Sequence, residues 1–429
     1  MEACNWNQVM QTNTRISRLS PFILYACALG AALAAGSARA EDGEGLKWTF
    51  GGFGSIGMVH SDYDQADFVA SVLKGDGAGG THAWVPDTDS RIAAQLGFTY
   101  NKKWSGVVQV ITEQRWNGSY KPVAEWVNVK YQATPDLALR VGRIALPIFL
   151  AADYRKIGYA YPWVRTPVEV YGGIPLTNSD GADVTYRWQT GGVKHVTQAF
   201  YGKAHINLSD DSFVKARGIA GVTHSAELGA TTLRASAFTA VLHTNLITFL
   251  FDGFRKFGPR GVAIAEKYDV VDKRTDGMTV SVNHDPGQWF VMAEAATTNG
   301  RSYLAKTRTM FVSAGYRAGE FTPYATYSRV DARSPTRDPG LPLAGLPRPL
   351  AAAAAELNYG LELTLRTIPV QTNFAAGVRW DFRPDMALKL QYERLKPRDG
   401  SRGTLTNLKP GFQSGVPVHV TSAVLDFVF

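Results

Sequence analysis

Apolar residues in this chain recur at every second position in many short segments, the period of a β-strand with one apolar and one polar face. Ile92, Leu96 and Tyr100 lie on one side of such a segment, and Gln95 lies on the other. The same alternation runs through residues 371–382. These segments predict strands that separate two different environments, such as lipid on one side and water on the other.

The alternation predicts sixteen strands and an all-β fold. Their ranges are 46–60, 90–100, 104–116, 123–132, 137–146, 182–189, 195–204, 213–225, 230–242, 277–284, 288–297, 307–317, 321–330, 371–382, 386–395 and 417–429. The seventh to ninth ranges alternate poorly, so their limits are the least certain part of the prediction.

The connections between these strands fall into two classes. Seven are short and rich in turn-forming residues, and they take every second place along the chain: 101–103, 133–136, 190–194, 226–229, 285–287, 318–320 and 383–385. Five of the other connections are long: 61–89, 147–181, 243–276, 331–370 and 396–416. Short turns at one end and long loops at the other are typical of outer-membrane β-barrels, with the short turns on the periplasmic side. The sequence therefore predicts a transmembrane antiparallel β-barrel of about sixteen strands, wide enough for an aqueous lumen.

Aromatic residues gather near the short-turn ends of the strands, as Trp104, Trp188, Trp289 and Trp380 illustrate. Such positions favour an aromatic girdle at the level of the lipid headgroups. Core aromatics of a water-soluble protein would instead be spread along the strands.

The last strand ends on an aromatic residue. Phe429, Phe427 and Leu425 face one way, while Asp426 and Val424 face the other. This ending resembles the C-terminal signature of bacterial outer-membrane β-barrel proteins, in which the last strand closes the barrel. The resemblance implies that Phe429 is a barrel-assembly signal.

The N-terminus has the features of a secretory signal. Arg15 and Arg18 precede an apolar stretch at 21–35, which is too short for a transmembrane helix, and residues 38–40 form a small-x-small cleavage site. We therefore expect a signal peptide at 1–40 and a barrel domain at 41–429.

Cysteine and charge narrow the prediction further. Both cysteines, Cys4 and Cys27, lie in the segment expected to be removed, so the mature chain would have no disulfide. Translation could begin at Met1 or at Met10.

Removing residues 1–40 takes away three Arg and one Glu, which lowers the net charge from +8 to +6. Cations such as Arg187 and Lys389 also outnumber acids at the predicted inward positions, which predicts a weak preference for anions. The alternative is that these residues only hydrate the wall and pair across neighbouring strands.

The third long-side connection, 147–181, is rich in apolar and aromatic residues, which a solvated loop does not need. Here the chain resembles the trimeric porin superfamily, and Gly142-Arg143-x-x-x-Pro147 is similar to the corresponding segment of phosphate-selective and related anion porins. The resemblance implies a long third loop folded into the lumen and a homotrimer. Neither the subfamily nor the solute follows from these motifs.

Six charged residues are candidates for the pore constriction: Arg140, Asp153, Arg155, Lys156, Arg165 and Glu169. Opposed charges across a narrow aqueous slot would select polar solutes. The alternative is that Asp153 pairs with Arg155, and Glu169 with Arg165, merely to hold the loop in place.

Two other connections have a helical pattern, with Leu250, Phe254 and Phe257 at helix spacing in one and an Ala- and Leu-rich stretch at 349–365 in the other.

Signals of a catalytic or metal site are weak in this sequence. Residues 52–57 match G-x-G-x-x-G but no helix follows, and the histidines show no metal-ligand spacing. We expect no catalytic residue, no cofactor and no metal.

The leading functional hypothesis is an outer-membrane channel of a Gram-negative bacterium for passive diffusion of small hydrophilic solutes. A substrate-specific uptake channel is the alternative, and a barrel hydrolase is a third. The expected partners are outer-membrane lipid, lipopolysaccharide and small hydrophilic solutes, with no nucleic acid.

Overall fold

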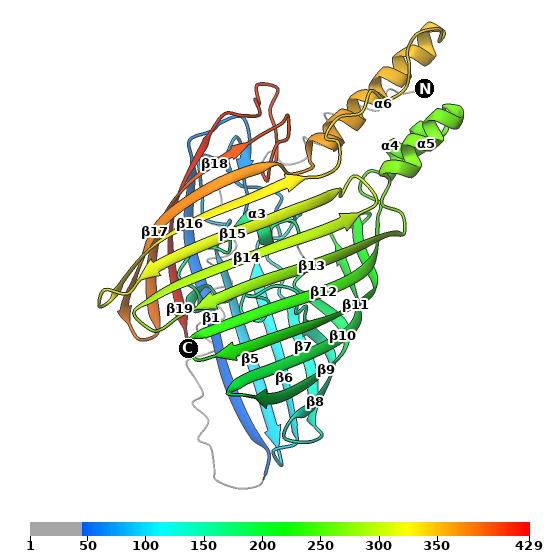
Figure 1. Ribbon diagram of the computed structural model, residues 1–429. Coiled ribbons are helices and arrows are strands. Elements are labelled where there is room, and N and C mark those ends of the chain that lie inside the picture. The colour runs from blue at the N-terminus through cyan, green and yellow to red at the C-terminus, as the bar shows by residue number, and fades with distance from the viewer. Residues whose placement is uncertain (1–44, 175) are drawn as a thin grey trace. The chain divides into compact units, whose positions relative to one another are not determined.

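The computed structural model describes residues 45–174 and 176–429, and its main feature is a closed antiparallel β-barrel (Figure 1). The barrel strands are β1 (Lys47–Ser61), β5 (Arg91–Tyr100), β6 (Trp104–Glu113), β7 (Val123–Gln132), β8 (Leu137–Ala145), β9 (Asn178–Thr190), β10 (Val193–Asn207), β11 (Phe213–Leu228), β12 (Thr231–Thr244), β13 (Lys273–His284), β14 (Trp289–Gly300), β15 (Lys306–Tyr316), β16 (Phe321–Ala332), β17 (Gln371–Arg383), β18 (Met386–Pro397) and β19 (Val418–Val428). Each strand pairs with the next in the chain, and β19 pairs with β1. The predicted sixteen strands are thus confirmed, and each predicted range overlaps one of them.

Three further strands, β2 (Asp67–Phe68), β3 (Ala78–Gly79) and β4 (Trp84–Val85), lie in the first long connection, where β4 pairs with the end of β1. The predicted signal peptide at 1–40, with Cys4 and Cys27, lies outside the described residues.

Irregular pairing explains the weak alternation of the seventh to ninth predicted strands. The register between β10 and β11 shifts at Gly202/Ala204, and that between β11 and β12 shifts at Arg217/Ala220. An extra residue on one strand reverses the inward and outward alternation beyond it. Arg217, which the plain alternation directs into the lumen, therefore shares the outward face with Val241 and pairs with Asp272 of the following connection.

The predicted asymmetry of the connections is confirmed. The seven turns at one end are short, as between β9 and β10, where Gly191 and Gly192 both have a positive φ. The connections 62–90, 146–177, 245–272, 333–370 and 398–417 at the other end are long. We call these the short-turn end and the long-loop end.

The barrel closes where the aromatic rings of β19 lie over glycines of β1. A Cβ atom on Gly52 would stand 2.3 Å from the ring of Phe429, and one on Gly54 would stand 2.3 Å from the ring of Phe427. The amide of Phe429 donates to the carbonyl oxygen of Gly52 (3.1 Å). Glycine is therefore required at both positions, because any side chain there would displace the terminal aromatics.

The outward face of the barrel has two sectors. The first, which we call the uncharged sector, is formed by β19, β1, β5, β6 and β7, whose described outward residues include no Asp, Glu, Lys or Arg. Its outward residues include Leu425, Ile56, Leu96, Val108 and Val129. In the second, on β8 to β18, charged residues face outward near the long-loop end. They are Arg143, Asp180, Lys203, Lys215, Arg217, Arg274, Asp276, Lys306, Arg308, Arg329, Asp331, Arg394 and Lys396.

Three helices extend beyond the strands at the long-loop end (Figure 1). They are α4 (Thr248–Arg255), α5 (Gly258–Tyr268) and α6 (Arg348–Arg366), and Phe251, Phe254, Ala354 and Leu361 are buried between them. The helical pattern predicted for these two connections is confirmed. Among the described residues, no helix is long and apolar enough to cross a membrane.

Candidate functional site

The third loop, residues 146–177 between β8 and β9, runs across the inner face of the barrel. The carbonyl oxygen of Pro147 accepts a hydrogen bond from Thr223 Oγ1 on β11 (2.6 Å), and the indole nitrogen of Trp163 donates to Ser313 Oγ on β15 (2.7 Å). Ser313 is buried, whereas its neighbour Val312 is exposed on the outer face. The third loop therefore contacts inward side chains of strands that are far from β8 and β9 around the barrel.

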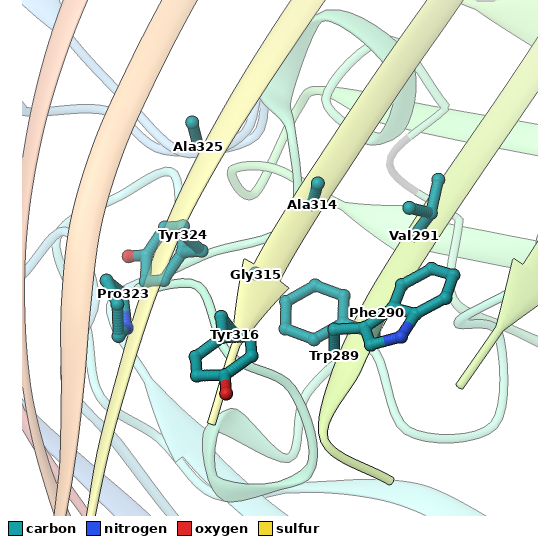
Figure 2. A pocket seen from close by; sticks show the side chains of 9 residues that line it. All are labelled: Trp289, Phe290, Val291, Ala314, Gly315, Tyr316, Pro323, Tyr324 and Ala325. Carbon is teal, nitrogen blue, oxygen red and sulfur yellow. The ribbon is translucent and has the colours of Figure 1, made fainter. Parts of the chain in front are cut away.

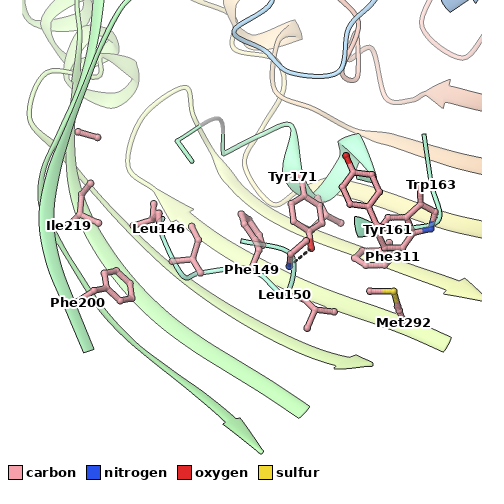
Figure 3. Close-up of a cluster of buried hydrophobic side chains, with 14 of the residues drawn as sticks. Leu146, Phe149, Leu150, Tyr161, Trp163, Tyr171, Phe200, Ile219, Met292 and Phe311 are labelled. Atoms are coloured by element: carbon pink, nitrogen blue, oxygen red, sulfur yellow. Dashed lines mark hydrogen bonds between the residues drawn. The ribbon is translucent and has the colours of Figure 1, made fainter. Parts of the chain in front are cut away.

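Apolar packing holds the loop against this wall (Figure 3). One buried cluster joins loop residues to wall residues of β10, β11, β14, β15 and β16; the loop members include Leu146, Phe149, Tyr161, Trp163 and Tyr171, and the wall members include Phe200, Ile219, Met292, Phe311 and Tyr324. Trp163 stands edge-on to Phe311, with ring centroids 5.6 Å apart. The aromatic richness of the loop is thus explained, because these side chains are removed from water on a preformed apolar surface.

Residues 158–171, which we call the return arm, contain the 3-10 helix η1 (Gly158–Ala160) and the short helix α3 (Val168–Tyr171). Lys389 on β18 fixes the start of this arm. Its ammonium group donates to the carbonyl oxygens of Gly158, Tyr161 and Trp163 at 2.7, 2.7 and 2.8 Å, and it pairs with Asp426 at 2.8 Å. Both side chains of this ion pair are 0% exposed. A buried charge without partners lowers the stability of the folded protein. The ammonium group of Lys389 therefore favours the conformation in which the three carbonyl groups and Asp426 surround it.

Arg165 fixes the middle of the return arm. Its guanidinium binds both carboxylate oxygens of Asp89 (2.9 and 2.6 Å), donates to Ser422 Oγ (2.6 Å) and pairs with Glu393. The side chain is only 4% exposed. Arg165 therefore joins the third loop to the first long connection and to the wall.

Glu169 lies on α3 and is 2% exposed. Its carboxylate accepts hydrogen bonds from Ser328 Oγ (2.7 Å) and Gln371 Nε2 (2.6 Å), and burial raises the pKa of Glu169 above its ordinary value. The alternative pairing of Glu169 with Arg165 is wrong, because Arg165 takes Asp89 and Glu393 instead.

Residues 152–157, which we call the turn segment, differ from the return arm. Asp153 is exposed. Arg155 donates to the backbone carbonyl oxygens of Ile174 (2.9 Å) and Tyr171, and no ion pair among the described residues joins it to Asp153. That alternative pairing is wrong too.

Lys156 pairs with Glu113 on β6 and with Glu125 on β7, the latter at 3.7 Å. Burial alone would lower the pKa of Lys156, but the two carboxylates raise it above its ordinary value. A cavity of about 10 Å³, close to the space of one water molecule, is lined by Glu125, Asp153, Arg155 and Lys156 among others. Three of the six predicted constriction residues thus meet at one polar cavity.

Arg140 lies apart from these residues, on β8, where it pairs with Asp183 of β9 at 2.7 Å. Its ion-pair partner Asp183 is a wall residue and does not belong to the third loop.

Further cations stand near the turn segment. Lys74, from the first long connection, is 6% exposed and donates to the carbonyl oxygen of Asp87 (3.4 Å), while Arg91 lies 3.9 Å from Glu113. Burial lowers the pKa of Lys74 to about 8. Together with Arg155 and Lys156 they make four cations, against the three carboxylates of Glu113, Glu125 and Asp153.

Sequence reasoning missed how several residues act. The strand alternation predicts Lys389 as an inward position but does not indicate its loop partners, which lie more than two hundred residues away in the chain. Glu393 meets Arg165 over a similar separation. Lys74 and Asp89 lie in a connection without a periodic pattern, so no signal marked them. Only the inward position of Asp426 beside β18 could have suggested a partner for a buried lysine.

The model of the Gram-negative porin family matches residues 26–413. The chain belongs to this family. Membership makes it an outer-membrane channel rather than an enzyme, in agreement with the closed barrel. A search of the curated proteins found no match.

Solved porin structures share the fold of this family member at low sequence identity. The anion-selective porin from Comamonas acidovorans is 11% identical with a TM-score of 0.55, and the match covers 90% of this chain and all of that one. OmpF of Salmonella typhi, in a complex with daunomycin, is 15% identical with a TM-score of 0.52 over 90% of this chain and 98% of that one. In-vitro folded OmpT of Vibrio cholerae, in its trimer form, is 10% identical with a TM-score of 0.50 over 90% of this chain and all of that one.

Proposed function

We propose that this porin lets small hydrophilic solutes diffuse passively across the outer membrane, and that the third loop sets the narrowest part of the path. The observation that supports the proposal is the set of contacts that the third loop makes with wall residues from β11 to β18. Solutes that pass the barrel then have to pass the loop.

A weak preference for anions follows from the charges near the turn segment. The four cations Lys74, Arg91, Arg155 and Lys156 outnumber the three carboxylates of Glu113, Glu125 and Asp153, and fixed charges beside a narrow path bias which ions enter it. The similar fold of a porin described as anion-selective agrees with this preference.

Planar-bilayer recording tests both statements. We expect an ohmic channel whose reversal potential in a salt gradient indicates anion preference. A channel that conducts no ions, or one selective for cations, would overturn the proposal.

A substrate-specific uptake channel is the second candidate, and the charged side chains of Asp153, Arg155 and Lys156 that meet on the third loop favour it. The same recordings separate the two. A specific channel is blocked by its solute in a saturable way, whereas a general diffusion channel keeps its conductance when small sugars, phosphate or carboxylates are added.

The assembly that we propose is a homotrimer. The uncharged sector on β19, β1 and β5–β7 is the part of the outward face best suited to contact other copies, because no charged strand residue has to lose its hydration there. A similar fold is described in a trimer form. Size measurement in detergent tests this, and Val108→Arg in the sector should give monomers while Val312→Arg on β15 should not.

Export is also part of the proposal, with cleavage of the segment 1–40 and recognition of Phe429 by the insertion machinery. N-terminal sequencing of the mature protein should begin at Glu41. Deletion of Phe429 should reduce the amount of folded barrel in the outer membrane, because the contacts of its ring and backbone with Gly52 are lost. Normal levels of the truncated protein would contradict an assembly role.

A further inference from the structure

Arg402, in the last long connection 398–417, is a cation without a partner for its side chain. The side chain is partly buried, its Nε atom is fully buried, and within the described residues the guanidinium makes no hydrogen bond and no ion pair. A guanidinium has five N–H donors, so its removal from water without a partner destabilises the folded protein. Burial lowers the pKa of Arg402 to about 10, in agreement with a missing partner.

The backbone around Arg402 is fixed by hydrogen bonds. The amide of Arg402 donates to the carbonyl oxygen of Arg366 at the end of α6 (2.9 Å). Ser401 is 0% exposed, and its Oγ donates to the carbonyl oxygen of Ile368 (2.5 Å) and accepts from the amide of Gly403 (2.9 Å). Gly403 has a φ of +62°, which favours glycine. The fold itself therefore determines where the unpaired cation stands.

The segment that contains Arg402 lies on the long-loop side of the third loop. The amide of Thr404 donates to Gln371 Oε1 (3.1 Å), and Gln371 Nε2 donates to Glu169 on α3 (2.6 Å). Gln371 is the first residue of β17, at the long-loop end of that strand. Arg402 is therefore at the mouth of the barrel, beyond the return arm.

Tyr303, in the connection between β14 and β15, interacts electrostatically with Arg402. Burial raises the pKa of Tyr303 to about 12, and Arg402 opposes part of this rise. The amide of Tyr303 donates to the carbonyl oxygen of Tyr268 at the end of α5 (2.9 Å), whereas no hydrogen bond within the described residues engages its hydroxyl group. Arg402 and Tyr303 thus supply unused donors near one another from two different connections.

The carboxylates of the surrounding connections do not neutralise Arg402. Asp331 accepts a hydrogen bond from Arg398 (2.8 Å), and Asp269, whose charge also acts on the phenol, pairs with the last residue of α4 at 2.5 Å. Asp399 lies three residues before Arg402, but it is exposed and no ion pair among the described residues joins the two. The counter-charge of Arg402 is therefore expected to come from solution.

The hollow over β14–β16, near the short-turn end, is a different kind of surface (Figure 2). Its volume is about 470 Å³, and Trp289, Tyr316 and Tyr324 are among its lining residues, none of which is charged. A small anion has no counter-charge there. The unpaired guanidinium at the mouth, and not the volume of this hollow, indicates where an anion binds.

We propose that Arg402 and Tyr303 form a binding site at the mouth for a tetrahedral oxyanion, such as inorganic phosphate or the phosphate group of a small solute. The planar guanidinium donates to two oxygens, and the hydroxyl group of Tyr303 donates to a third. A carboxylate has only two oxygens, both of which the guanidinium takes. The inference goes beyond the proposed channel function and does not depend on it, because binding at the mouth does not require that ions pass through the barrel.

Thermal unfolding of the purified protein in detergent tests the site, with sodium phosphate as the probe and sodium acetate at equal ionic strength as the comparison. Phosphate should stabilise the wild type in a saturable way and more than acetate does, since a ligand that binds only the folded state stabilises it. Arg402→Gln should need on the order of tenfold more phosphate or above for the same gain, because charge-assisted hydrogen bonds are the strong ones. Without phosphate, Arg402→Gln should be at least as stable as the wild type, because an unpaired charge is removed.

Tyr303→Phe should weaken the response to phosphate and leave the response to acetate unchanged. The matched control is Lys409→Gln, which removes an exposed cation from the same connection and should respond to phosphate like the wild type.

Equal stabilisation of the wild type and Arg402→Gln by phosphate would overturn the site, and so would equal losses of response in Arg402→Gln and Lys409→Gln. A lower stability of Arg402→Gln without phosphate would also overturn it, because the guanidinium would then have a partner within the protein. A response that disappears in Arg155→Gln but persists in Arg402→Gln would place the oxyanion at the turn segment instead.

Discussion

The return arm and the turn segment of the third loop carry charge in opposite ways. In the return arm, Arg165 and Glu169 are buried, and strong hydrogen bonds or ion pairs to the wall satisfy them. In the turn segment, Asp153 is exposed, and Arg155 donates to two backbone carbonyl oxygens and lies over the Tyr171 ring, so neither has an ion-pair partner among the described residues. Lys156 is the exception in this segment, because it pairs with Glu113 and Glu125. Charges of the first kind fix the position of the loop, whereas charges of the second kind can act on a passing ion.

Electrostatics explains why the difference matters. A guanidinium bound to two carboxylates, as Arg165 is, has little net field outside its own pocket. Salt screens what remains within about 10 Å at 0.1 M ionic strength. We therefore expect substitutions in the return arm to change loop position and stability, and substitutions in the turn segment to change selectivity.

The largest effect should come from Lys389→Met. This change leaves Asp426 buried without its cation and removes the lysine donor from three loop carbonyls, of which Tyr161 keeps Arg379 as a donor (3.1 Å), at a cost of about 3–5 kcal/mol. The return arm should then detach from the wall. Single-channel conductance should rise, and liposome-swelling assays should show entry of larger sugars.

The control is the double variant Lys389→Met with Asp426→Leu, which removes both charges of the pair. It should recover much of the lost thermal stability, since a buried ion pair can be replaced by apolar residues. Its conductance should stay raised, because the loop carbonyls still lack the lysine donor. Wild-type conductance and stability in the single variant would show that Lys389 does not hold the arm.

The next largest effect is expected in the turn segment. Replacing Arg155 and Lys156 with Glu reverses two of the four cations near the polar cavity, so reversal potentials should move toward cation preference, more strongly at low salt. The same change at Arg333 and Arg337, in the connection 333–370, is the matched control. Equal shifts from the two pairs would mean that the third loop is not the constriction.

Much of the fold could be predicted from the sequence, because a barrel wall between lipid and water imposes a period of two on every strand. The prediction failed locally where that period breaks, as at the bulge that turns Arg217 outward. The contacts of the site could not be predicted. Lys389 meets the carbonyl oxygens of Gly158, Tyr161 and Trp163, and carbonyl groups leave no mark in a sequence.

A smaller effect should follow from the pH. Burial lowers the pKa of Lys74 to about 8 from its ordinary 10.5, so this cation near Arg91 and Lys156 loses its charge between pH 7 and pH 9. Anion preference should fall over that range in the wild type. Folding stability should rise from pH 8 to pH 10.5, because there the unfolded chain binds the proton more tightly.

Two variants of Lys74 separate this group from others that titrate. Lys74→Gln should have a weaker anion preference at pH 7 and no step between pH 7 and pH 9, and Lys74→Arg should keep the preference at both values. A step that persists unchanged in Lys74→Gln assigns the titration to another residue.

The smallest effect on selectivity is expected from Glu169→Gln, which tests the return arm from the opposite direction. The amide keeps the shape of the side chain and an oxygen that can accept from Ser328 or Gln371. Because burial raises the pKa of Glu169, the folded wild type pays for ionisation as the pH rises through that pKa. The variant should therefore be slightly more stable than the wild type at pH 7 and equal to it near pH 4, as thermal unfolding in detergent can measure.

The reversal potential of Glu169→Gln should match that of the wild type at every salt concentration. A shift toward anions would show that the charge of Glu169 acts on permeating ions, and the division of the third loop into a holding arm and a selecting turn would then be wrong.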